Sequence, residues 1–176
     1  MKKKTSNKKR AYLDDFILNE AGKYEYKGTI YKIVSEFDKN YLIRRIVLLT
    51  VCLVGAGFVP FSGSMHAFYI ITPYMVEIVV LALLVYAYIQ FIGSKGEIRE
   101  YIFKKSVERF KPYSSLIIGN IGLTFISTMI YSFINGFELW AIAYVSLHVI
   151  AFISIRQFYA YVSTIKCDKI SLKQEM

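Results

Sequence analysis

The stretch TPYMVEIVVLALLVYAYIQFIG, residues 72–93, decides the fold class, because it is apolar almost throughout. A helix needs roughly 20 such residues to cross about 30 Å of hydrocarbon. One acidic residue, Glu77, interrupts the run. The stretch therefore predicts a transmembrane helix, and it raises the question of how deep the carboxyl group of Glu77 lies.

Three further apolar runs accompany this one. Hydrophobic residues make up 55% of the 176-residue chain, and they are gathered in these blocks instead of being spread as in a soluble domain. The predicted fold class is an all-α integral membrane protein with four transmembrane helices, arranged as two tandem hairpins. The expected spans are about 42–61, 66–92, 114–134 and 138–161.

Basic side chains are confined to three parts of the chain, residues 1–45, 95–111 and 156–173. The short connections 62–67 and 135–138 carry no lysine or arginine. Basic residues are retained on the cytoplasmic side during membrane insertion. We therefore expect a multi-pass protein of the plasma (cell) membrane with both termini in the cytoplasm.

This threading divides the chain into a membrane domain and three cytoplasmic parts. The four-helix domain is expected over residues 42–161. The cytoplasmic parts are an N-terminal segment (1–41), a loop (93–113) and a C-terminal tail (162–176). Nearly all of the polar mass is thus expected on one side of the membrane.

The net charge of +9 predicts a lipid partner as well as the membrane topology. Cytoplasmic blocks of lysine and arginine attract anionic headgroups. A nucleic-acid partner is not expected, because no aromatic platform or groove-reading helix accompanies the basic N-terminus. The basic residues expected at the inner membrane surface are Arg44, Arg45, Lys104, Lys105 and Arg109.

Two local patterns occur in the cytoplasmic parts. Residues 24–33 alternate large and polar side chains around Lys27-Gly28, which predicts a short β-hairpin. Residues 96–110 place Ile98, Ile102, Ser106 and Phe110 at four-residue steps, which predicts an amphipathic surface helix that ends at Pro112.

The two halves of the chain resemble each other. Residues 30–41 align with residues 102–113, so that Tyr41 matches Tyr113. Each half then reads as a charged cytoplasmic segment followed by a hairpin of two spans. Because each unit crosses the membrane twice, this weak internal repeat would be of the parallel type.

The depth of Glu77 depends on where its helix begins. A start near Met65 leaves Pro73 inside the helix as a kink. A start at Pro73, with Thr72 as the N-cap, would put Glu77 in the second turn. We favour the first interpretation, because the rise from Tyr88, at the inner aromatic belt, to Glu77 is roughly 16 Å and reaches the middle of the hydrocarbon.

Side chains on two other helices are expected at the same level. Counting helical rise from the inner belt places Thr124 and His148 beside Glu77. An ionisable group in hydrocarbon should face the bundle interior and a partner. We therefore hypothesise a hydrogen bond between Glu77 and His148 across the two halves, within a candidate intramembrane polar site formed by Glu77, His148, Thr124 and Asn120. The alternative is that these groups only fix helix packing.

The sequence carries no enzyme signature: there is no glycine-rich phosphate loop, no C-x-x-C pair and no nucleophile with an obvious base. Cys52 and Cys167 predict neither a disulfide nor a metal site. No catalytic residue, metal or cofactor is expected. The favoured function is a non-catalytic accessory or interaction subunit, with a membrane-protein partner or a homo-oligomer. The alternative is a small oligomeric transporter or channel subunit that uses the Glu77/His148 layer.

Overall fold

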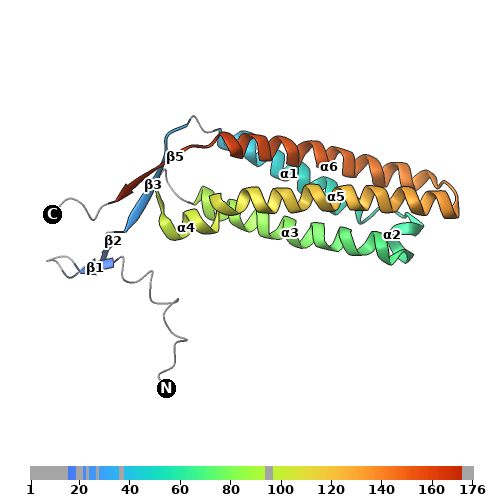
Figure 1. Cartoon of the computed structure of the whole chain (residues 1–176), viewed down its shortest axis with the longest axis horizontal. Helices are drawn as coiled ribbons and strands as arrows, with labels where there is room; N and C mark the ends of the chain where they lie inside the picture. The colour runs from blue at the N-terminus through green and yellow to red at the C-terminus, as the bar shows by residue number, and fades with distance from the viewer. Residues whose placement is uncertain are drawn as a thin grey trace, which may run out of the picture.

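The structure is a computed structural model that describes residues 16–18, 22, 24–26, 28–35, 38–93 and 97–171. Long helices lie side by side in a bundle, and short strands gather at one of its ends (Figure 1). The helices are α1 (Lys39–Ala56), α2 (Ser62–His66), α3 (Phe68–Ile92), α4 (Glu100–Lys105), α5 (Val107–Asn135) and α6 (Leu139–Thr164). The strands are β1 (Phe16–Leu18), β2 (Tyr24–Tyr26), β3 (Thr29–Ile33), β4 (Glu97–Arg99) and β5 (Cys167–Ser171).

Three helical segments of the described chain are long and apolar enough to cross a membrane: α3, the run Glu100–Asn135 that combines α4 and α5, and α6. They suggest a multi-pass membrane protein. Helix α1 is not among them, because its 18 residues include Lys39, Arg44 and Arg45. The predicted fold class is therefore confirmed in part: the structure is mostly helical, with three long apolar helices that could cross a membrane and a small antiparallel sheet in addition.

Helix α3 contains Pro73 in its interior, which is the arrangement that we favoured from the sequence. Proline has no backbone N–H and leaves the carbonyl four residues earlier without its usual partner. Nearby, the Thr72 hydroxyl donates to the Phe68 carbonyl at 2.9 Å. The Ser62-Gly63-Ser64 segment before α3 belongs to the short helix α2.

The helices of each half pack mainly against helices of the other half. Helix α3 lies along α5, and α1 lies along α6, whereas α1 and α3 share only a small contact. Helix α5 also packs along α6 and so joins the two pairs. The Ser154 hydroxyl strengthens the α1–α6 pair by donating to the Arg45 carbonyl at 2.8 Å.

The predicted β-hairpin at residues 24–33 is wrong. Strand β2 pairs with β1, while β3 lies in the centre of a second, antiparallel sheet in the order β4-β3-β5. The C-terminal tail supplies β5, a longer partner than β2 could be, and pairs with β3 from Thr29 to Ile33. The Tyr31 ring also stacks on Phe103 of α4, with ring centroids 4.0 Å apart, which fixes β3 against the helices.

The prediction that Pro112 ends the surface helix is also wrong. The break lies at Ser106, between α4 and α5, and α5 continues through Pro112 to Asn135. Pro112 is tolerated because the carbonyl that it leaves unpaired belongs to Glu108, an exposed residue in the first turn of α5, where water can replace the lost bond.

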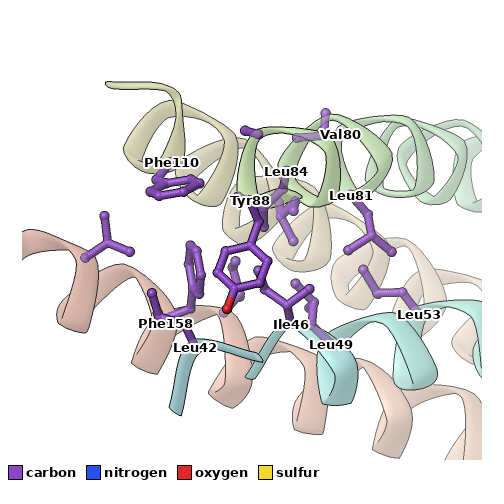
Figure 2. Packing of buried hydrophobic residues seen from close by; sticks show 14 of the residues in the cluster. Leu42, Ile46, Leu49, Leu53, Val80, Leu81, Leu84, Tyr88, Phe110 and Phe158 are labelled. Carbon is purple, nitrogen blue, oxygen red and sulfur yellow. The ribbon is translucent and has the colours of Figure 1, made fainter. Parts of the chain in front are cut away.

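A cluster of large apolar side chains fills the interior toward the sheet end of the bundle (Figure 2). The centroid of the Phe110 ring lies 5.5 Å from that of Phe91 and 5.7 Å from that of Phe158. Tyr88, which the sequence placed in the inner aromatic belt, is therefore a core residue. Phe61 and Phe158 are buried as well, and each of the three is at most 5% exposed.

Candidate functional site

Glu77 is fully buried in the bundle interior, with 0% of its surface exposed. It lies on the same face of α3 as the buried residues Val80, Leu81 and Leu84. The helical rise from Phe68 to Glu77 is roughly 13 Å, so the carboxyl group lies well inside the bundle and away from both ends of α3. A charge at this depth needs a partner.

Thr124 of α5 supplies the first partner. Its hydroxyl donates to Oε1 of Glu77 at 2.5 Å. The next residue along this face, Thr128, donates its own hydroxyl to the Thr124 carbonyl at 2.8 Å. Both threonines are buried, so one oxygen of the Glu77 carboxyl group is held on a dry helix face.

His148 of α6 approaches the other carboxyl oxygen. Its Nε2 lies 3.4 Å from Oε2 of Glu77, and the imidazole is 2% exposed. This separation is longer than an N–H···O hydrogen bond, which spans about 2.7 to 3.2 Å. The structure thus brings the two side chains together as we hypothesised, but at a looser distance than the hydrogen bond that we expected. The other ring nitrogen, Nδ1, lies 2.8 Å from the Tyr144 carbonyl.

Two tyrosines complete the layer. The Tyr144 ring packs on the imidazole of His148 at 4.4 Å between centroids, and Tyr74 meets the same imidazole edge-on at 6.1 Å. The Tyr74 hydroxyl donates to the Leu53 carbonyl at 2.9 Å, which links the layer to α1. We define the polar layer as Tyr74, Glu77, Thr124, Tyr144 and His148.

Neither tyrosine was expected in this layer from the sequence. Their signal was helical spacing, because Tyr74 precedes Glu77 by three residues and Tyr144 precedes His148 by four. Asn120, by contrast, does not join the layer. It is partly exposed, and its amide donates to the Leu116 carbonyl at 2.8 Å.

The five basic residues expected at the membrane surface lie toward the sheet end of the bundle. Arg45 is half-buried, with its guanidinium 5.0 Å above the Tyr41 ring. Lys104 pairs with Glu100 at 2.6 Å, and Lys105 bonds to the Tyr101 hydroxyl. The exposed members of the set are Arg44, Lys104, Lys105 and Arg109.

A cavity of about 240 Å³ lies against His148 on the side of α5 and α6. Its lining is Ile121, Gly122, Phe125, His148, Val149 and Phe152. Within the described residues, no group of three or more histidine, cysteine or acidic side chains is placed to hold a metal ion. The chemistry available in the polar layer is therefore the chemistry of one carboxyl group, one imidazole and three hydroxyl groups.

No family model matches the chain, and no characterised protein or solved structure is significantly similar to it.

Proposed function

We propose that this chain is a four-span protein of the cell membrane that acts without catalysis, as an accessory or interaction subunit. The fourth span in this proposal is α1. Strands β3 and β4 are hydrogen-bonded to each other, so they lie on one side of the membrane. Helices α1 and α3 connect them, and a crossing by α3 requires a second crossing to return the chain.

Helix α1 is long enough for that second crossing. Its 18 residues rise roughly 27 Å, close to the thickness of the hydrocarbon core. The basic residues that distinguish it from the three candidate spans lie in its first two turns, at the sheet end. Long basic side chains at such a position extend to the headgroups while their stems stay in hydrocarbon.

The same parity argument applies to the second half, because β4 and β5 share a sheet and α5 and α6 connect them. The proposed threading therefore has the whole sheet on one side, which the distribution of lysine and arginine assigns to the cytoplasm. Cytoplasmic anionic headgroups would lie against the exposed members of the basic set.

The main support for the interaction role is the pair of open edges of this sheet. In the described part of the chain, β4 and β5 are its two edges, and each presents backbone groups that a further strand can pair with. Addition of an extended segment to a sheet edge is a common mode of protein recognition. We propose that a cytoplasmic segment of a partner subunit, or of a second copy, binds there.

The polar layer favours a second candidate function, a small oligomeric transporter or channel subunit. Buried ionisable groups inside a membrane domain are typical of ion and proton pathways. Glu77 and His148 approach each other across the two halves of the chain, at the level where such a pathway would pass.

The threading is tested by labelling with a membrane-impermeant thiol reagent. Cysteine replacements at Met65 and Asn135, which are exposed at the end of the bundle opposite the sheet, should react in intact cells. Cys167 should react only after the membrane is opened. Labelling of Cys167 from outside would overturn the proposed topology.

Liposomes distinguish the two functions. Purified protein is reconstituted, and internal pH and membrane potential are followed for the wild type, Glu77→Gln and His148→Ala. The accessory role predicts no flux from any of the three, and loss of partner binding when Ile170 on β5 is replaced by proline. A flux that Glu77→Gln abolishes would support the transporter instead.

A further inference from the structure

We propose that Glu77 and His148 form a proton-binding site inside the bundle, in which one proton is shared between Oε2 of the carboxyl group and Nε2 of the imidazole. The pair then has no net charge. This inference holds for either proposed function, because it concerns what the two side chains bind and not what the whole protein transports or contacts.

The surroundings of His148 determine which of its ring nitrogens carries a hydrogen. Its Nδ1 lies 2.8 Å from the Tyr144 carbonyl, which can only accept a hydrogen bond. Nδ1 must therefore carry a hydrogen and donate it. In a neutral imidazole only one nitrogen is protonated, so Nε2 would present a lone pair toward Glu77.

The two oxygens of the Glu77 carboxyl group have different neighbours. Oε1 of Glu77 already accepts from the Thr124 hydroxyl, and Oε2 faces Nε2 at 3.4 Å. Neither Oε2 nor Nε2 has another hydrogen-bond partner among the described residues. An ionised carboxylate beside a neutral imidazole would therefore bring two lone pairs together in a buried place, where nothing compensates them.

One proton between the two atoms removes this conflict. It can reside on Oε2, which gives a carboxylic acid and a neutral imidazole, or on Nε2, which gives a carboxylate and an imidazolium. The two forms differ only in the position of the proton. Loss of that proton leaves a negative charge in the bundle interior and gain of a second leaves a positive one, and both are costly in hydrocarbon.

No other charged group near the pair competes for this role in the described structure. The titratable side chains that face it are Tyr74 from α3 and Tyr144 from α6. Helix α5 contributes Thr124, and α1 contributes the Leu53 carbonyl, which the Tyr74 hydroxyl occupies. The cavity beside His148 is otherwise lined by apolar side chains and glycine.

The test uses nitrogen NMR of full-length protein in lipid, labelled with ¹⁵N at histidine. The chain has two histidines, so His66→Gln leaves His148 as the single labelled side chain. We expect Nδ1 to carry a hydrogen, because it lies against the Tyr144 carbonyl. Infrared spectroscopy on the same samples reports whether the Glu77 carboxyl group is protonated, as a band that Glu77→Gln removes.

The proposal requires one of two combined results: a protonated carboxyl group with a bare Nε2, or a carboxylate with a protonated Nε2. A bare Nδ1 would overturn it. So would a carboxylate beside a bare Nε2, or protonation of both groups together. The only variant changed inside the polar layer is the infrared control, Glu77→Gln. Its side-chain amide can still accept a hydrogen bond from the Thr124 hydroxyl and donate one to Nε2 of His148.

Discussion

Two layers of the bundle lie in its interior but are held together by different interactions, and every side chain in them except the partly buried Tyr74 is at most 5% exposed. The apolar layer, Leu42, Leu84, Tyr88, Phe110 and Phe158, lies toward the sheet and is shown in Figure 2. The polar layer lies further from the sheet. Lipid tails are as apolar as leucine, so helices in a membrane gain from close packing and from directed hydrogen bonds. The apolar layer depends mainly on the first of these, with one hydrogen bond from the Tyr88 hydroxyl to the Lys39 carbonyl at 3.2 Å, and the polar layer uses both.

The difference shows how the register of the helices is specified. Interdigitated rings fill space, and a shifted helix can restore much of their contact with other apolar side chains. The Thr124–Glu77 bond and the Nε2–Oε2 approach cannot be restored in another register, because each needs one atom at one place. The polar layer therefore specifies which residues of α3, α5 and α6 meet.

The largest effect is expected from emptying the apolar layer. Phe110→Ala removes a fully buried ring that contacts three others, and it leaves a cavity. The free energy of unfolding in detergent should therefore fall by roughly 3 kcal/mol. Circular dichroism during denaturant titration measures the change. Phe133→Ala, on the same helix but 93% exposed, is the control and should change stability little. Equal losses for the two variants would contradict the packing described.

A smaller loss is expected at the edge of the polar layer. A Cβ at Gly57 would lie 2.5 Å from the Tyr74 hydroxyl, so Gly57→Ala should push Tyr74 away from the Leu53 carbonyl. We expect a destabilisation of about 2 kcal/mol from this crowding. Gly55→Ala is the matched control, because its Cβ would meet only Leu147 at 3.9 Å. A neutral Gly57→Ala would show that the tyrosine contact is dispensable.

The hydrogen bond inside the polar layer should contribute less. Thr124→Val keeps the shape of the side chain and deletes the hydroxyl that Oε1 of Glu77 accepts from. The expected cost is about 1 kcal/mol, the usual scale for such bonds between membrane helices. Thr128→Val deletes a hydroxyl that bonds only to a backbone carbonyl, and it should cost less. If the order were reversed, the bond to Glu77 would not organise this layer.

The smallest effect lies outside both layers and concerns reactivity. Burial raises the pKa of the Cys167 thiol, and the charge of Asp168 raises it further. The folded state therefore keeps the thiol proton at a pH where the unfolded chain has lost it. Maleimide labelling of Cys167 at mildly alkaline pH should be slower in folded protein than in unfolded protein. Asp168→Asn should speed the folded reaction modestly, whereas an unchanged rate would leave burial as the sole cause.

The sequence was informative wherever hydrophobic length decided the outcome. Three of the four predicted spans correspond to long apolar helices, and the helix that holds Glu77 contains Pro73 as expected. Helical rise alone also placed Thr124 and His148 at the level of Glu77, where the structure has them. Rise is nearly constant along a helix, which is why residues on separate helices could be compared in depth.

The sequence was misleading wherever the partner is distant in the chain. The alternation around Lys27-Gly28 indicated extended backbone, but strand pairing depends on which other strand is near, and β5 lies far away in the sequence. The aromatic residues show the same limit. Phe61 and Phe133 have the same ring and lie in similar sequence surroundings, yet one is 0% exposed and the other 93%. Only the packing of the helices separates an interior ring from an exposed one.

The pairing of β3 with β5 has a consequence for biogenesis. Strand β3 is synthesised before any of the long helices, and its neighbour β5 leaves the ribosome only after the last of them. During most of translation, the edge of β3 that later pairs with β5 therefore has no partner strand. The sheet therefore closes only after every long helix has been synthesised, so a chain shortened before Cys167 would keep an unpaired strand edge on β3.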